Sequence, residues 1–258
     1  MTMPILQIKD IGFGYQKKQV LSRVSFDVKK GEIIGIIGPN GSGKTTLLKI
    51  IDGLLFPQEG EILVEGEFLR QKNRKELAGI IAFVPQEFSL VFPFSVQEIV
   101  MMGRYPHLNN LRFEGNDDYR IVREAMEMTD TLHLSKRMIH HISGGERQRV
   151  LIARALAQKP RIMLLDEATA FLDIKYQIAL FELIKKLNKL RGLTVIVVTH
   201  DINLAGQYTD RIILLQDGKI HSIGTPELVI TEDNINEVYE ADVLVDKNPR
   251  TGAPRVTL

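Results

Sequence analysis

The chain has 258 residues, of which 44% are hydrophobic and 25% charged, and its formal net charge is +1. These values are ordinary for a soluble globular protein with one large domain or two lobes, and so small a net charge predicts neither nucleic acid nor an anionic surface as a partner. Cysteine is absent, which excludes disulfides and cysteine-type metal sites. No apolar run approaches the roughly 18 residues that a membrane-spanning helix needs, and the first residues do not read as a signal peptide.

Near the start of the chain, two segments alternate apolar and polar residues, as half-buried strands do: Ile5 to Lys9 and Val24 to Val28. Between them lies Tyr15, for which two interpretations remain open. Its ring either stacks on an adenine or packs on the core as an ordinary strand aromatic. From the residues alone, core packing is favoured, because aromatic residues are common in strands.

A glycine-rich segment, GPNGSGKTT, joins an apolar run at Glu32 to Ile37 to the apolar start of a helix at Leu47 to Ile51. Strand, glycine-rich turn and helix are the context in which G-x-x-x-x-G-K-[ST] indicates a nucleotide phosphate site. Inward-pointing backbone N–H groups and the helix N-terminus attract phosphate, Lys44 reaches the β and γ phosphates, and the Thr45 hydroxyl binds Mg²⁺. A turn without a ligand is the alternative. The residues predicted to bind nucleotide here are Gly38, Pro39, Asn40, Gly41, Ser42, Gly43, Lys44, Thr45 and Thr46.

Two further runs, Glu61 to Val64 and Ile80 to Val84, predict strands that share a mixed sheet with the first two. Pro85 ends the second run, and Gln86 follows it. A bidentate, uncharged glutamine in a loop is suited to orienting a water or contacting a metal, although alone Gln86 is an unremarkable loop residue.

From Glu87 to Pro160 the extended patterns disappear, and helical patterns separated by turns rich in Pro, Gly and Asn replace them. We predict helices over Val96 to Met102, Asp117 to Thr131 and Gly145 to Gln158. They form a helical insertion between two strands of one sheet.

Within this insertion, the segment ISGGE provides Ser143 as the N-cap of a helix that begins around Gly145. A Ser-Gly-Gly at a helix start is also a second anion-binding end. The segment is therefore either only a cap or one of two halves of a single site, and the presence of two phosphate-type helix ends favours the second interpretation.

An entirely apolar run from Ile162 to Leu165 ends in Asp166 and Glu167. Such a run fits the buried centre of a parallel sheet, and open α/β sheets bind ligands at the C-terminal ends of their strands. Asp166 is expected to hold Mg²⁺ through water, and Glu167 to polarise the attacking water. The alternative, a solvated acid pair, is disfavoured by the preceding phosphate loop.

Downstream, Ile174 to Leu190 predicts a long amphipathic helix and Thr194 to Val198 a buried strand, which His200 follows. Beside a phosphate site His200 is expected to contact the γ-phosphate or hold the water, although a lone histidine is more often structural. A hairpin over Arg211 to Ile223 precedes short helices from Pro226 and a polar tail without a recognisable motif. Apolar strands that alternate with amphipathic helices predict an α/β fold with a mostly parallel core sheet.

Together these motifs resemble those of the ATP-binding subunits of the ABC transporter superfamily, from Tyr15 to about Pro226. GPNGSGKTT is similar to the phosphate loop, Gln86 to the Q-loop, ISGGERQRV to the signature, IMLLDE to the second acidic motif and His200 to the switch histidine. Five motifs in the right order are far more specific than one. The segments MGRYPH, at Met102 to His107, and INEVYEADVLV look most similar to ATPases of bacterial iron-chelate, haem and cobalamin importers, although relatives for molybdate share much of the pattern.

The resemblance implies a RecA-like P-loop core with a mostly parallel sheet, an N-terminal antiparallel β-subdomain and a helical subdomain over about 87–160. The ATPase domain would span 1–240 and the tail 241–258. In this family two subunits face each other head to tail, with each ATP between the phosphate loop of one and the signature of the other.

The same resemblance implies the roles of single residues. Tyr15 becomes the adenine platform, Glu167 the general base, and Gln86 and His200 sensors of the γ-phosphate and the water. Thr45, Gln86 and Asp166 would contact Mg²⁺. The nucleotide contacts from the signature side would be Ser143, Gly144, Gly145, Glu146 and Asp173.

Four positions depart from the family pattern. Ile142 and Glu146 replace the Leu and Gln of LSGGQ, Ala168 replaces a proline, and Phe171 stands in the segment usually written SALD. The resemblance therefore leaves the ribose contacts of Glu146 and the effect of Phe171 on subunit communication as open questions.

The resemblance also implies partners. ATP would close the homodimer, hydrolysis would open it, and the insertion would pass this motion to an integral membrane permease through a groove near Gln86 to Tyr105. The chain would lie peripherally on the cytoplasmic face of the inner membrane, act indirectly with a substrate-binding protein, and power import of a metal chelate such as iron-siderophore, haem, cobalamin or molybdate. The alternatives are the ATPase of an exporter and a soluble ABC protein acting on nucleic acid or ribosomes, and no basic stripe or coiled-coil insertion favours the latter.

Overall fold

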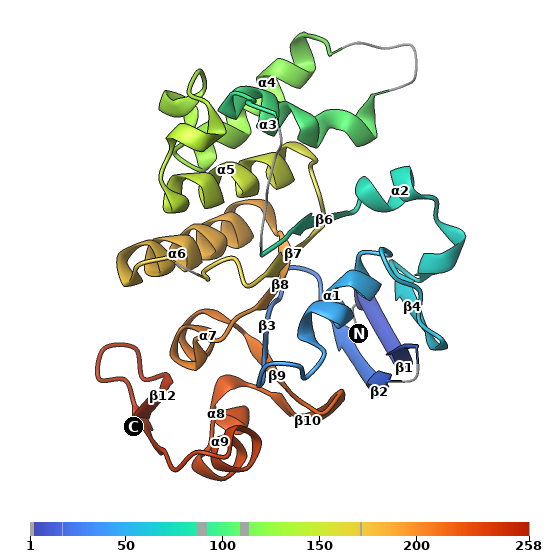
Figure 1. Cartoon of the computed structure of the whole chain (residues 1–258), viewed down its shortest axis with the longest axis vertical. Helices are drawn as coiled ribbons and strands as arrows, with labels where there is room; N and C mark the ends of the chain where they lie inside the picture. The colour runs from blue at the N-terminus through green and yellow to red at the C-terminus, as the bar shows by residue number, and fades with distance from the viewer. Residues whose placement is uncertain (1–2, 17, 87–91, 109–113, 171, 258) are drawn as a thin grey trace.

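The computed structural model describes residues 3–16, 18–86, 92–108, 114–170 and 172–257 (Figure 1). Two positions singled out in the sequence, Glu87 and Phe171, lie outside the described residues. Within the described ranges, no helix is both long and apolar enough to cross a membrane.

The centre of the molecule is a sheet with the strand order β10-β9-β3-β8-β7-β6 among the described residues. Neighbouring strands run parallel from β9 to β6, and only β10 is antiparallel to its neighbour. The predicted α/β fold with a mostly parallel core is thus confirmed. The strands are β3 (Ile33–Ile37), β6 (Ile81–Val84), β7 (Ile162–Asp166), β8 (Thr194–Val198), β9 (Arg211–Gln216) and β10 (Lys219–Gly224).

A second, antiparallel sheet has the order β2-β1-β4-β5. Its strands are β1 (Leu6–Tyr15), β2 (Lys18–Val28), β4 (Glu59–Val64) and β5 (Glu67–Phe68). The prediction that Ile80 to Val84 joins this sheet is wrong, because β6 pairs in parallel with β7 in the central sheet. Parallel pairing needs a crossover connection, and the long helical segment between β6 and β7 supplies it, whereas the short helix α2 (Arg74–Ala78) separates β6 from the antiparallel sheet.

Helices cover both faces of the central sheet (Figure 1). On one face, α1 (Lys44–Ile51) lies between the two sheets and shares a hydrophobic cluster with β1, β3 and β4. On the other face, α6 (Ile174–Arg191) and α7 (Ile202–Tyr208) pack on β7 and β8. The continuous apolar sequences of β3, β7 and β8 follow from this burial on both faces, since every residue of these strands is buried.

The chain between β6 and β7 forms the helical part at the top of Figure 1, with a hydrophobic cluster of its own. Its main elements are α3 (Val96–Met101), the 3₁₀ segment η2 (Met102–His107), α4 (Asn116–Met128) and α5 (Gly144–Ala157). The predicted helix over Asp117 to Thr131 ends early, at Met128. The hydroxyl of Thr129 bonds to the Ala125 carbonyl at 3.0 Å, and Asp130 takes a positive φ of 54°, which stops the helix.

The last part of the chain is more ordered than its composition suggests. Two short helices, α8 (Pro226–Val229) and α9 (Glu232–Tyr239), are followed by an antiparallel hairpin of β11 (Leu244–Lys247) and β12 (Pro254–Thr257). This hairpin was not predicted from the sequence, since its strands are only four residues long each and half of their residues are exposed.

Candidate functional site

The predicted phosphate loop connects β3 to α1, and its glycines permit a path that other residues would block. A Cβ on Gly38, whose φ is 147°, would lie 2.1 Å from the Leu215 carbonyl oxygen. Gly43 is the N-cap of α1 with a φ of 100°, and a Cβ there would meet the Leu21 side chain at 2.7 Å. The loop therefore wraps tightly against β9 and β2 because it carries glycine at these two positions.

Lys44 lies inside this loop and is only 4% exposed. Its Nζ donates to the carbonyl oxygens of Gly38 and Pro39, each at 2.9 Å. Burial lowers the pKa of Lys44, while the nearby carboxylates of Glu167 and Asp166 oppose this shift. The ammonium group is thus held in place beneath the loop.

Thr45 and Asp166 meet across the site. The Thr45 hydroxyl, in the first turn of α1, donates to Asp166 Oδ1 at the end of β7 over 3.0 Å. Burial raises the pKa of Asp166, a shift that the Thr45 hydrogen bond and the lysines of α1 only partly offset. A cation bound here would favour the ionised carboxylate.

Glu167 is the central residue of the site. Gln86 Nε2 donates to its Oε2 at 2.6 Å, and His200 Nε2 lies 2.6 Å from its Oε1. Its backbone has a positive φ of 47°, a conformation that costs a non-glycine residue on the order of 1–2 kcal/mol. Hydrogen bonds from its N–H to Val198 O (3.0 Å) and from Ala170 N–H to its carbonyl (2.8 Å) hold it there. Three sequence motifs from three separate segments thus converge on one carboxylate.

The phosphate loop, Gln86 and Glu167 border a cavity of about 790 Å³ that runs from Tyr15 to Glu167. The Tyr15 side chain is 48% exposed and packs against the edge of Phe13, with ring centroids 5.0 Å apart and planes at 88°. Phe13, rather than Tyr15, is the buried aromatic of this strand. The Tyr15 ring is therefore available at one end of the cavity. This differs from core packing, the interpretation that the residues alone favoured.

Five residues that line the cavity were missed by the sequence reasoning: Lys18, Gln19, Val20, Asp217 and Gly218. The Gly218 N–H donates to the Ser42 carbonyl at 3.2 Å, so the turn between β9 and β10 supports the phosphate loop. The turn itself is readable in the sequence, but its contact with a loop about 175 residues away has no local signal.

The predicted signature segment folds as expected but lies apart from the residues that line this cavity. Ser143 is the N-cap of α5, and its hydroxyl accepts from the Glu146 N–H at 3.3 Å. In return Glu146 Oε2 accepts from the Ser143 N–H at 2.8 Å, which completes a capping box. These hydrogen bonds lower the pKa of Glu146. The glutamate that departs from the family pattern thus caps its own helix.

The signature packs against the start of α6 instead. A Cβ on Gly145 would lie 2.7 Å from the Tyr176 ring, so glycine is needed for this contact, and Gly144 lies near Leu172. Asp173, at the N-cap position of α6, is exposed and makes no capping bond with its side chain. Ser143, Gly144, Gly145, Glu146 and Asp173 are therefore not brought to Lys44 and Glu167 by the fold of one chain.

The donor set at Thr45 and Asp166 consists of oxygen atoms, the type that Mg²⁺ prefers. Within the described ranges, no group of three or more His, Asp or Glu side chains is placed to hold a metal. The site thus fits an ion that takes one or two protein oxygens and completes its shell with water and phosphate, as Mg²⁺ does.

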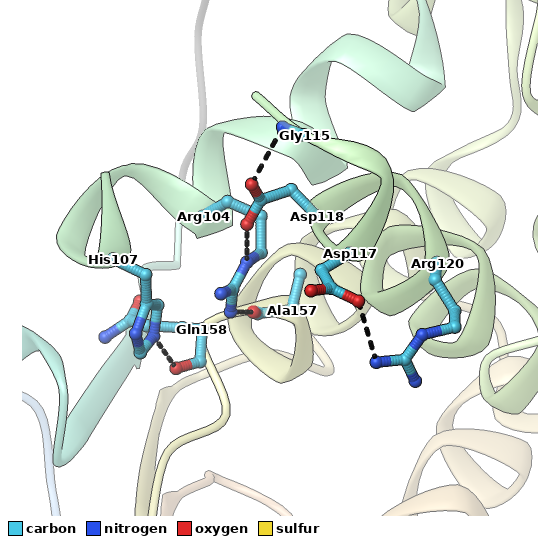
Figure 2. Close-up of polar contacts among 8 residues, drawn as sticks. All are labelled: Arg104, His107, Gly115, Asp117, Asp118, Arg120, Ala157 and Gln158. Carbon is cyan, nitrogen blue, oxygen red and sulfur yellow. Dashed lines mark hydrogen bonds and ion pairs between the residues drawn. The ribbon is translucent and has the colours of Figure 1, made fainter. Parts of the chain in front are cut away.

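A second cavity, of about 900 Å³, lies between α2, the start of β6 and η2, and Tyr105 and Pro106 form part of its wall. This wall is anchored to the end of α5 (Figure 2). The buried Arg104 donates to Asp118 Oδ1 at 2.9 Å and to the Ala157 carbonyl at 2.6 Å, and His107 Nε2 lies 2.7 Å from the Gln158 carbonyl. The Tyr105 side chain between these two anchors is 79% exposed. We call this cavity the α2–η2 groove.

Comparison with known proteins gives consistent results. The sequence profile described as ABC transporter matches residues 21–170. The chain is 40% identical over 259 residues to the hemin import ATP-binding protein HmuV of Gloeobacter violaceus, a match that covers 98% of this chain and 93% of HmuV. Three other curated relatives are also 40% identical, and the chain spans only 58% to 60% of their length.

Two solved structures extend the comparison. An inward-facing ABC transporter of the metal-chelate type matches with a TM-score of 0.87 and 30% identity, covering 98% of this chain and 96% of that chain. A dimeric bacterial ABC transporter cassette matches with a TM-score of 0.75 and 33% identity, covering 85% of this chain and 98% of that chain.

Proposed function

The chain belongs to the ABC transporter family, and from this premise we propose that it binds and hydrolyses Mg·ATP to power a membrane permease. The observation that carries the proposal is the arrangement at Glu167. One carboxylate contacts Gln86 and His200 at 2.6 Å each and lies beside the Thr45–Asp166 pair and the buried Lys44. A structural acid pair does not need a glutamine, a histidine, a threonine and a lysine from three other segments around it.

In this proposal the triphosphate lies along the cavity with its base on the Tyr15 ring. Backbone N–H groups of the loop and the N-terminus of α1 bind the phosphates, and Lys44 exchanges its loop carbonyls for β and γ oxygens. The buried hydroxyl of Ser42, which has no hydrogen-bond partner in the described part of the chain, is one further donor available to a phosphate.

Glu167 acts as the general base. Glu167 Oε2 accepts a hydrogen bond from Gln86 and Oε1 lies 2.6 Å from His200 Nε2, and each oxygen keeps a further lone pair for a water proton. As that proton leaves, the water oxygen bonds to the γ-phosphorus and the bond to the bridging oxygen breaks, which yields ADP and phosphate. Gln86 and His200 orient the carboxylate and the water. Thr45, Asp166 and Gln86 would hold Mg²⁺, which would neutralise charge on the phosphate oxygens.

The site is completed by a second copy of the chain. The cap of α5 at Ser143 is exposed and lies outside the cavity, although its free N–H groups suit a γ-phosphate. Two chains placed head to tail would bring Ser143, Gly145 and Asp173 of one to the nucleotide of the other. The match to a dimeric cassette supports this arrangement.

The α2–η2 groove is the surface proposed for the permease. It combines apolar side chains such as Leu77 and Phe83 with an exposed Tyr105, which suit it to a short helix from a membrane partner. The sequence reasoning placed this contact near Gln86 to Tyr105, a range of which residues 87–91 lie outside the described residues.

The proposed cargo is a metal chelate that enters the cell with the help of a substrate-binding protein, and the chain would sit at the cytoplasmic face of the membrane. Support comes from the similarity to a hemin import protein and to a transporter of the metal-chelate type. Release of phosphate from Mg·ATP by the purified chain tests the enzymatic part. Turnover should vanish in Glu167→Gln while nucleotide binding remains, and hydrolysis by this variant at the wild-type rate would refute the assigned base.

A further inference from the structure

The position of His200 depends on the start of α7. Asp201, the next residue, is the N-cap of this helix and accepts from the Leu204 N–H at 2.8 Å, while its own N–H donates to the Thr199 hydroxyl at 3.1 Å. His200 therefore lies between the end of β8 and the first turn of α7. A displacement of this turn changes where the imidazole lies relative to Glu167.

The first turn of α7 is held from outside by the hairpin of β11 and β12. Asn203 Nδ2 donates to the Val256 carbonyl at 3.2 Å, and Asn203 Oδ1 accepts from the Val256 N–H at 2.8 Å. The amide thus pairs with both backbone groups of one residue in β12, much as a neighbouring strand would. Because both bonds start from a single short side chain, they fix the distance and the rotation of the helix turn relative to the hairpin.

A second contact makes the helix and the hairpin fit closely. Gly206 faces the hairpin, and a Cβ at this position would lie 3.2 Å from the Pro254 carbonyl and 2.9 Å from the Ile230 side chain. An alanine favours a helix by about 1 kcal/mol over glycine, so glycine here has a packing reason. It lets β12 lie directly on α7.

The hairpin is itself well anchored. Arg255 pairs with Asp246 across it, with Nε 2.8 Å from Oδ1. Val245 and Val256 pack on a buried cluster that contains Ile37, the last residue of β3 before the phosphate loop. Just upstream of the hairpin, the buried hydroxyl of Tyr239 lies beside the Gly38 backbone, and burial raises its pKa to about 12. The same segment therefore abuts the site at both the loop and the His200 side.

We propose that the β11–β12 hairpin positions His200 for catalysis, with Asn203 as the positioning residue that connects them. This inference rests on the proposed function, since it concerns the rate of ATP hydrolysis. Asn203 does not touch the nucleotide. It acts through α7, so loosening it should slow turnover and leave ATP binding, which depends on the loop and Tyr15, intact.

The test compares four variants of the full chain in steady-state ATP hydrolysis and equilibrium ATP binding. Asn203→Ala removes both bonds to Val256 and should lower kcat by about tenfold, with KM and Kd for ATP unchanged within about twofold, because catalysis is sensitive to small displacements of an orienting group. Asn203→Asp keeps the acceptor for the Val256 N–H and should fall between Asn203→Ala and the wild type. Gly206→Ala favours the helix yet pushes the hairpin away, and should lower kcat in the same way.

Asn73→Ala is the matched control. It removes an asparagine that caps α2, on the opposite side of the molecule from β12 (Figure 1), and its kcat should equal that of the wild type. The ¹⁵N shifts of the His200 imidazole should move in Asn203→Ala and Gly206→Ala but not in Asn73→Ala. A stability effect alone would not produce this pattern.

The outcomes separate the two proposals. If the wild-type chain does not hydrolyse Mg·ATP, the proposed function itself fails. If it does, and folded Asn203→Asp and Gly206→Ala both show wild-type kcat and unmoved His200 shifts, the positioning role is overturned. Should Asn203→Ala not fold, those two variants still decide the question.

Discussion

Two regions of the chain have the residue types of a phosphate site, and they differ in how complete they are. Around Glu167, side chains from four segments bond to one another, and Lys44 and Asp166 are only 4% and 3% exposed. At the signature, the side chains of Ser143 and Glu146 form a capping box with each other's backbone N–H groups, and Ser143 and Gly144 are exposed.

This difference teaches which parts of the site one chain can build. Buried polar groups must find partners within the fold, so the Glu167 region is fixed by its own hydrogen bonds. An exposed helix N-terminus satisfies its N–H groups with water and is free to exchange that water for a ligand. The first region is suited to holding a nucleotide, and the second to closing on a nucleotide held by another chain.

Ser143→Arg should have the largest effect on ATP hydrolysis, because it changes the signature region. A bulky cation in place of the cap should block closure of the second region and lower ATP hydrolysis by at least about a thousandfold, as loss of aligned donors does in other active sites. Binding of ATP to a single chain should stay within about twofold of wild type, since Ser143 is outside the cavity. Titration calorimetry together with phosphate release checks both halves. Full hydrolysis in this variant would contradict a shared site.

Lys44→Ala tests the region around Glu167. It removes a buried ammonium group and should weaken ATP binding by about a hundredfold, the equivalent of one or two charge-assisted hydrogen bonds. A fluorescent ATP analogue measures this loss, and the exposed Lys30 supplies the control Lys30→Ala. Equal affinity of Lys44→Ala and wild type would remove the first region from nucleotide binding.

Two aspartates allow the region around Glu167 to be compared with the α2–η2 groove. Burial raises the pKa of both Asp166 and Asp52, and at Asp166 the hydrogen bond from Thr45 opposes this shift. Asp52 lines the groove, and burial raises its pKa to about 7, a shift that the charge of Arg74 opposes. A carboxyl with a raised folded pKa contributes stability below its ordinary pKa, and this contribution is lost as pH rises through about 7.

Asp52→Asn should therefore raise the melting temperature at pH 8 by about 2–4 °C and by less than half as much at pH 5, because the stability lost to ionisation accrues between the unfolded pKa of 3.8 and the folded pKa of about 7. Thermal unfolding at the two pH values measures the difference. Equal shifts at both pH values would show that ionisation of Asp52 is not what costs stability.

The smallest effect concerns the unusual glutamate of the signature. Glu146→Gln keeps an oxygen that accepts from the Ser143 N–H, and should cost less than about 0.5 kcal/mol, whereas Glu146→Ala should cost about 1 kcal/mol of unfolding free energy. The Ser143 hydrogen bonds lower the pKa of Glu146, so its ionised form stabilises the fold above pH 4.5 and this contribution is lost as pH falls through the lowered pKa. Denaturant titrations of the two variants at pH 7 measure both costs, and a larger loss in Glu146→Gln than in Glu146→Ala would rule out the capping role.

The sequence predicted best what is local. The strand–loop–helix around Lys44, the acid pair at the end of β7, the cap at Ser143 and the strand before His200 each depend on a few neighbouring residues, and each lies where it was expected. The family resemblance implied that Gln86 and His200 sense the γ-phosphate and the water, but their contacts with Glu167 were not predicted, because no spacing rule relates residues 86, 167 and 200.

What the sequence could not predict depends on distant pairing. The sheet to which β6 belongs is decided by β7, almost eighty residues later, and the cavity wall at Asp217 by a turn that folds back onto Ser42. The β11–β12 hairpin has two strands of four residues each, and it is held by Asn203 of α7 and by the packing of Val245 and Val256 on a distant cluster, contacts that its own pattern does not reveal.

The most direct test of the central claim is the molar mass of Glu167→Gln in solution, measured by light scattering with and without Mg·ATP. If two chains clasp the nucleotide and cleavage separates them, this variant should be a monomer without nucleotide and a stable dimer with Mg·ATP, and the added substitution Ser143→Arg should abolish the dimer. A monomer at saturating Mg·ATP, or a dimer that ignores Ser143→Arg, would contradict the account.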